Sequence, residues 1–233
     1  LTFTRASTAT YIRNGVVYNA AVNEARIGTN GLLVEISRTN VIPYSQQFDS
    51  WSKTLTIVTA DATVAPDGTT TADKIIATAS SGAPYVYRSS ISCTAGQPYT
   101  LSGFAKAGEY SNLTLFLPST AYVAVQRMAW FNLATGTVGG TESGVTARIQ
   151  PLGGGYYRCS ITATADTTAS GAPGYALGTE TAGVNEVFTG DGTSGLYLWG
   201  AQIENAAQMS SYIPTVAAAG TRPQKPGPGA PRG

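Results

Sequence analysis

The feature that most constrains this chain is a long series of short strand-like segments, each closed by a turn signal. Between residues 41 and 214 there are about eight to ten such segments, and none has the 3.6-residue periodicity of an amphipathic helix. Thr, Ser, Gly, Val and Tyr dominate the composition, which is usual for short strands and frequent turns. The sequence therefore predicts an all-β chain folded as an antiparallel sandwich or barrel.

Composition and charge exclude several classes of protein. Charged residues make up 12% of the chain and the formal net charge is +1, so the clustered basic excess of a nucleic-acid binder is missing. No apolar run approaches the roughly 18 residues of a membrane span, so we expect no membrane insertion. Histidine is absent, which removes the commonest general base and the commonest metal ligand.

The organisation along the chain predicts three parts. Residues 1–40 contain Asn14-Gly15, a type I′ hairpin signal, and a third short strand over residues 31–35. We expect this part to be a β strap or attachment segment, packed against the main domain or a neighbouring subunit. Residues 41–215 form the sandwich, and residues 216–233 are a Pro/Gly-rich tail or linker. The chain begins at Leu1 without a signal-peptide pattern, which suggests a piece of something longer.

Alternation along the strands predicts which side chains form the core. Residues 99, 101, 103 and 105 share one face of their strand, and residues 157, 159 and 161 share one face of theirs. In the last strand, Tyr197 and Trp199 are expected on the core face with residues 201 and 203, and Trp130 is also expected in the core. Cys93 and Cys159 fit two buried thiols; a disulfide between neighbouring strands, which needs Cα atoms within about 7 Å, is the alternative.

A set of segments in a characteristic order carries a resemblance to a known family. The order resembles phage virion proteins, tail-fibre and head-fibre components with a carbohydrate-binding-module-like jelly roll. The resembling segments are residues 3–11, 14–15, 31–35, 38–40, 48–51, 65–74, 95–102, 155–160, 190–204 and 211–215. Together they cover most of residues 2–215, and the Pro-rich tail lies outside them. The resemblance implies a jelly roll on the surface of a phage particle, assembled as a homo-oligomer with a trimer favoured, with other virion proteins as partners.

The same resemblance implies non-catalytic binding of host-surface polysaccharide, and a purely structural decoration or fibre-attachment role is the alternative. Sugar recognition needs aromatic faces for stacking and polar groups for the hydroxyls. By alternation, a set of polar and aromatic residues falls on the sheet face opposite the core, which makes it the candidate binding set, although a face packed on other subunits would look the same. The set is Arg88, Ser102, Lys106, Tyr156, Arg158 and Gln202.

Catalysis and metal binding have weaker support in the sequence. Glycoside hydrolysis needs two carboxyl groups roughly 5–10 Å apart, and no pair of acids stands out, so we expect no enzyme and no cofactor. Jelly rolls of this kind often hold a structural calcium ion, which needs six to eight oxygen ligands. The candidates also suit ordinary turns and caps, so no ligand set is assigned. They are Asp49, Asp61, Asp67, Asp73 and Asp191.

Overall fold

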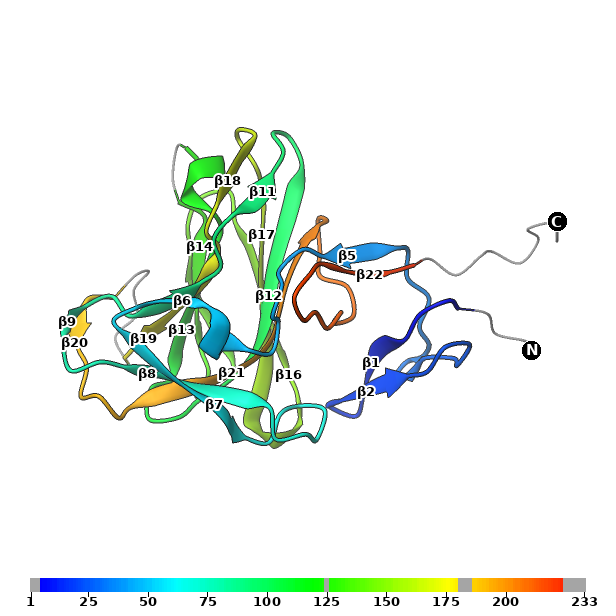
Figure 1. The fold of residues 1–233 in the computed structure, drawn as a ribbon, viewed down its shortest axis with the longest axis horizontal. Coiled ribbons are helices and arrows are strands. Elements are labelled where there is room, and N and C mark those ends of the chain that lie inside the picture. Colours follow the sequence, from blue (N-terminus) through cyan, green and yellow to red (C-terminus); the bar gives the residue numbers. More distant parts are fainter. Residues whose placement is uncertain (1–4, 124–125, 180–185, 224–233) are drawn as a thin grey trace.

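The computed structural model describes residues 5–123, 126–179 and 186–223. It confirms the predicted fold class, because two six-stranded antiparallel sheets pack as a sandwich and small N-terminal hairpins lie beside it (Figure 1). Among the described residues, no helix has the length and apolar character needed to cross a membrane.

The first sheet contains six antiparallel strands: β7 (Thr56–Thr63), β8 (Ala72–Ala77), β12 (Pro98–Lys106), β16 (Thr146–Pro151), β17 (Tyr156–Thr164) and β21 (Gly195–Asn205). Their order across the sheet is β16-β17-β12-β21-β8-β7, and we call it the β12 sheet. The second sheet contains β6 (Ser52–Thr54), β10 (Tyr85–Tyr87), β13 (Asn112–Phe116), β14 (Met128–Asn132), β15 (Thr137–Thr141) and β19 (Gly174–Gly178). Its order is β15-β14-β13-β19-β10-β6, and we call it the β13 sheet.

The remaining elements are short. Strand pairs outside the two sheets are β1 (Ala9–Arg13) with β2 (Val16–Ala20), β3 (Ile27–Gly28) with β4 (Gly31–Leu32), β5 (Arg38–Asn40) with β22 (Gly220–Arg222), β9 (Ser81–Gly82) with β20 (Phe188–Thr189), and β11 (Ile91–Cys93) with β18 (Ala169–Gly171). Three single-turn 3₁₀ helices are η1 (Phe48–Ser50), η2 (Ser119–Ala121) and η3 (Gly153–Gly155).

The main core lies between the two sheets. Leu101, Cys159 and Ile161 point into it, which confirms the predicted inward faces of β12 and β17. Gly103 lies on the same inward face, where a Cβ would meet the ring of Tyr175 from the opposite sheet at 2.9 Å. The missing side chain therefore lets the tyrosine cross the core, and its hydroxyl donates to a β12 carbonyl at 2.8 Å.

The two cysteines are buried free thiols, and they form no disulfide with each other. Both belong to the main core, Cys93 on β11 and Cys159 on β17. They behave as small apolar side chains, which is the reading favoured for them from the sequence.

The N-terminal hairpin forms at the predicted position. Asn14 and Gly15 both have positive φ, 51° and 78°, as a type I′ turn between β1 and β2 requires. The third strand was predicted over residues 31–35. The structure has a strand only over the first two of these, because β4 ends at Leu32, so the prediction is wrong for residues 33–35. After that point Glu35 forms ion pairs with Arg26 and Arg222.

Strand β21 does not keep its alternation from end to end. Leu198 and Ala201 both point into the main core although they are three residues apart. The register with β12 shifts here in a β-bulge, and Gly200 occupies it with a φ of +64°. The predicted core facing of Tyr197 and Trp199 is therefore wrong, since the bulge inverts the alternation and turns Trp199 to the other face of the sheet.

That other face of the β12 sheet is also buried. A second apolar cluster lies on it, formed by Val17, Ala65, Ala72, Phe104, Tyr156, Trp199 and Tyr212. The ring centroid of Trp199 is 5.1 Å from that of Phe104 and 4.8 Å from that of Tyr212, and its side chain is 1% exposed. The N-terminal hairpin and the chain after β21 therefore cover this sheet on the side away from the sandwich (Figure 1).

The chain stays within the fold beyond residue 215, where the predicted tail begins. β22 pairs with β5, and the buried Arg222 donates to the Ile36 carbonyl at 3.2 Å and lies 3.4 Å from a Glu35 carboxylate oxygen. The folded part of the chain thus extends through β22, past the predicted boundary at residue 215. Residues 224–233 of the predicted tail, like residues 1–4 of the predicted strap, lie outside the described residues.

Candidate functional site

The structure brings together five of the six residues predicted to bind a ligand. Ser102, Lys106, Tyr156, Arg158 and Gln202 all lie on the face of the β12 sheet opposite the main core, as alternation predicts. The sixth, Arg88, lies apart. It follows β10 of the other sheet, packs over the ring of Tyr44 at 5.0 Å and donates to the Ser50 carbonyl at 3.1 Å.

Four of these five side chains are buried, so the five do not form an open surface, and ligand binding by them stays a prediction. Ser102 and Gln202 are fully buried, and Tyr156 and Arg158 are almost so. The physical reason is the second apolar cluster, which draws the N-terminal hairpin and the C-terminal segment onto this face. Gln202 is used inside the protein: it donates to Glu204 at 2.8 Å and accepts from the backbone N–H of residue 213 at 2.6 Å.

An outward aromatic surface occurs instead on the β13 sheet. Because Val86, Leu115 and Phe131 point into the main core, alternate residues of the same strands point away from it. Those outward residues include Tyr85, Tyr87, Phe116, Met128 and Trp130. We call this set the aromatic face.

The aromatic face encloses a shallow hollow of about 340 Å³. Tyr85 packs against Tyr87 with ring centroids 5.6 Å apart, and edge-on against Phe116 at 5.7 Å. The outward position of β19 between them is Gly174, where any side chain would overlap the Phe116 ring. The hollow is lined by Tyr85, Tyr87, Phe116, Ser119, Gln126, Met128 and Ala172.

Trp130 extends the aromatic face across the neighbouring strands. Its indole lies against Gly139 and Gly140 of β15, where a Cβ on either glycine would overlap the ring. The ring is half-buried and its Nε1 has no hydrogen-bond partner within the described part of the chain. The expectation that Trp130 belongs to the core is therefore wrong: its neighbour Phe131 takes the core position. The sequence signal that Trp130 lies against the neighbouring strand was the glycine pair Gly139-Gly140 in that strand.

Three of the candidate calcium aspartates lie around one hollow of about 320 Å³: Asp49, Asp61 and Asp73. Asp73 is buried, and its two carboxylate oxygens accept from the backbone N–H groups of Phe48 at 2.7 Å and Asp61 at 3.0 Å. Burial raises the pKa of Asp73 to about 6, and the two neighbouring acids add to the rise.

This hollow does not fit a calcium ion. Among the residues that the structure describes, no group of three or more His, Cys, Asp or Glu side chains is placed to hold a metal. The Asp73 carboxylate is already used to fix the backbone of η1 and of β7, so its role is structural.

No protein-family model matches the chain, and no curated protein matches it. The fold by itself places the chain among antiparallel β-sandwich proteins.

Proposed function

We propose that the chain is a phage virion fibre or adhesion protein that binds host-surface carbohydrate, without catalysis, through the aromatic face of the β13 sheet. The observation that carries this proposal is the hollow between Tyr85, Tyr87 and Phe116, with Gln126 among the residues that line it. Aromatic rings stack on the apolar faces of sugars, and amide and hydroxyl groups bond the sugar hydroxyls. The phage assignment rests on the order of sequence segments.

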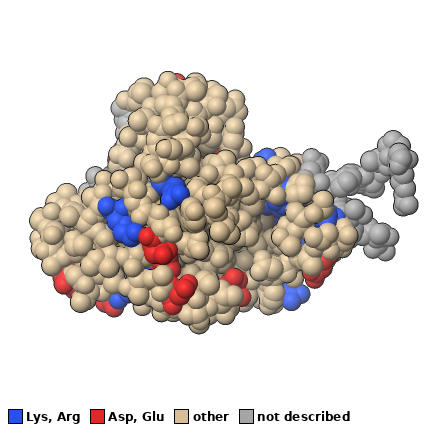
Figure 2. All heavy atoms as spheres, viewed as in Figure 1, with Lys and Arg blue, Asp and Glu red and all other residues tan. Residues whose placement is uncertain are grey.

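The low charge of the protein agrees with an uncharged ligand at this face. Charged side chains are sparse over the side of the molecule drawn in Figure 2. Among the residues that the structure describes, no acidic or basic side chain lines the hollow. Recognition there would depend on stacking and neutral hydrogen bonds, which tolerate physiological salt because they involve no ion pair.

A glycan array probed with the full chain tests the proposal. We expect binding to neutral host glycans, and a loss of about tenfold or more in affinity for Tyr87→Ala, since one stacking ring of the hollow is removed. Tyr18→Ala is the matched control, because Tyr18 is a half-buried tyrosine on β2, outside the hollow. Absence of binding to every glycan, or equal losses in the two variants, would contradict the proposal.

The structural alternative, a decoration or fibre-attachment protein, is favoured by a different observation. Apolar side chains stand exposed on and near the N-terminal hairpins, including Val34 at 63% and Ile36 at 52%. We propose that a second copy of the chain covers them, since a net charge of +1 gives little repulsion between copies.

Light scattering coupled to size-exclusion chromatography tests this assembly. We expect a homo-oligomer, with a trimer favoured, that dissociates when Val34→Ser and Ile36→Ser are combined. Val64→Ser, at an exposed valine between β7 and β8, is the control and should leave the assembly intact. A wild-type protein that is monomeric at micromolar concentration would contradict the proposed assembly.

A further inference from the structure

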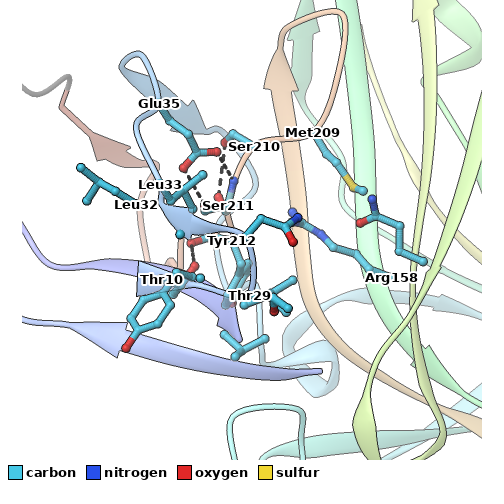
Figure 3. Close-up of a pocket in the computed structure, with 17 residues that line it drawn as sticks. Thr10, Thr29, Leu32, Leu33, Glu35, Arg158, Met209, Ser210, Ser211 and Tyr212 are labelled. Carbon is cyan, nitrogen blue, oxygen red and sulfur yellow. Dashed lines mark hydrogen bonds between the residues drawn. The ribbon is translucent and has the colours of Figure 1, made fainter. Parts of the chain in front are cut away.

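A cavity of about 460 Å³ separates the N-terminal hairpins from the β12 sheet, on the side away from the aromatic face. This volume is within the range of small-molecule sites, roughly 300–1,000 Å³. Figure 3 shows its two sides: Thr10, Thr29, Leu32 and Leu33 lie on the hairpin side, and Arg158 reaches in from the sheet.

Arg158 is the unusual member of this lining. Its side chain is 3% exposed, so its charge has lost most of its hydration. Its hydrogen bonding is incomplete, because Nη2 donates to Ser102 Oγ at 3.2 Å while the buried Nε has no partner within the described residues. The guanidinium also packs on the ring of Phe104, 5.1 Å from its centroid.

No carboxylate in residues 5–123, 126–179 and 186–223 forms an ion pair with Arg158. The nearest candidates are used elsewhere. Glu35, which also lines the cavity, lies 2.5 Å from Arg26 and 3.4 Å from Arg222, so its charge is offset by two arginines. Glu204 accepts from Gln202 at 2.8 Å and from the backbone N–H of Ser210 at 2.9 Å.

Burying a protonated arginine with no carboxylate within ion-pair distance is costly, and the charges of Glu204 and Glu35 offset only part of that cost. Burial lowers the pKa of Arg158 to about 10, which still leaves the group charged at neutral pH. A ligand carboxylate would supply the missing acceptors, because a guanidinium offers donors in the planar fork that carboxylates match. The apolar side chains of Leu32, Leu33 and Met209 would meet the ring that carries such a group.

We propose that this cavity is a second binding site, which takes a carboxylate carried on a sugar-sized ring, with Arg158 as the residue that recognises the carboxylate. That the ring is a saccharide rests on the proposed function. The recognition of a carboxylate does not, because it follows from Arg158 and its surroundings.

Nuclear magnetic resonance of the full chain tests the site directly. The Arg158 Nε–H signal is assigned through the side-chain carbons of Arg158 in isotope-labelled wild-type protein, and it is followed while glucuronate, glucose or inorganic phosphate is added. We expect glucuronate to shift this signal at concentrations up to about 10 mM, and glucose to leave it in place. No shift with glucuronate, an equal shift with glucose, or an equal shift with phosphate would each overturn the proposal.

Calorimetry with variants gives the second readout. Arg158→Met should weaken glucuronate binding by at least about tenfold, the value of one charge-assisted hydrogen bond. Arg148→Met is the matched control: Arg148 is an exposed arginine on the neighbouring strand β16, outside the cavity, and its loss should change nothing. Equal losses in the two variants would refute the assignment, and if Arg158→Met does not fold, the shift in the wild-type protein decides.

Two further measurements are needed. The first distinguishes a polysaccharide from a free small carboxylate as the ligand, and the second distinguishes failure of this proposal from failure of the proposed function. A glucuronate-containing oligosaccharide that binds at least as tightly as the free acid supports a polysaccharide unit as the ligand, and binding of the free acid alone supports a free small carboxylate. In Tyr87→Ala, glucuronate binding should persist. Retained glucuronate binding in a protein that binds no neutral glycan would mean that the aromatic-face proposal fails while the cavity proposal stands.

Discussion

Truncation of Trp199 measures how strongly the N-terminal hairpin and the segment after β21 are held on the β12 sheet. A buried aromatic side chain removes about 150–250 Å² from water, which at about 25 cal/mol per Å² gives an upper limit of about 4–6 kcal/mol. Large-to-small changes at tryptophan cost about 3–5 kcal/mol. Trp199 is 1% exposed and packs on Phe104 and Tyr212, and its Nε1 donates to Thr71 Oγ1 at 3.0 Å. We therefore expect Trp199→Ala to lower the free energy of unfolding by about 4 kcal/mol.

Urea denaturation measures that loss, and amide hydrogen exchange locates it. Because Trp199 lies in the second cluster, exchange should accelerate first in the hairpin, for instance at the Val17 N–H, which donates to the Pro66 carbonyl at 3.0 Å. The β17 amide of Ile161, in the main core, should be affected less. Trp130→Ala is the control, with an expected loss of about 1–2 kcal/mol because its ring is half-buried. A loss below about 1 kcal/mol at Trp199 would refute the reasoning.

Three other results are expected. Gly200→Ala should lower the free energy of unfolding by about 2–3 kcal/mol in urea denaturation, since the φ of Gly200 is +64° and a Cβ would lie 2.8 Å from the Phe104 ring. An unchanged stability would contradict the claim that the bulge requires glycine. Asp73 has its pKa raised by burial, from 3.8 to about 6, so its contribution to stability is complete below pH 3.8 and is lost as pH rises through about 6. Wild type should therefore lose up to about 3 kcal/mol relative to Asp73→Asn between pH 4 and 7, and a constant difference would count against this. Burial raises the pKa of Cys93 to about 11 and raises that of Cys159 as well, so a thiol reagent at pH 8 should label neither cysteine until the protein unfolds; rapid labelling of the native protein would show that the thiols are accessible.

Local sequence features predicted the sandwich and much of its core because they act within a strand or a turn. Alternation places Leu101 and Ile161 inward wherever a strand stays regular, and Asn14-Gly15 adopts the positive φ values that a two-residue hairpin needs. The same alternation failed at Gly200, because a single bulge inverts the facing of everything before it. No property of the flanking residues marks that glycine as a bulge rather than an ordinary small residue.

The candidate site could be predicted only in part, for a related reason. Sequence reasoning placed Ser102, Arg158 and Gln202 on one face, and the structure agrees. It could not show that the N-terminal hairpin and the segment around Tyr212 return to cover that face. Some of the contacts that hold these segments join residues more than 160 positions apart, such as Asn40 and the Ile203 N–H. They depend on how two distant apolar surfaces fit.

The sequence alone thus determined the all-β class, the hairpin and the regular strand faces, because hydrophobic alternation and turn chemistry are local. Only the tertiary structure decided which sheet face is open. The β12 sheet carries an apolar cluster on each side, the outer one is covered by the N-terminal hairpin and the segment after β21, and Arg158 is left in a cavity. The aromatic face of the β13 sheet stays partly exposed, because no described segment packs over its hollow.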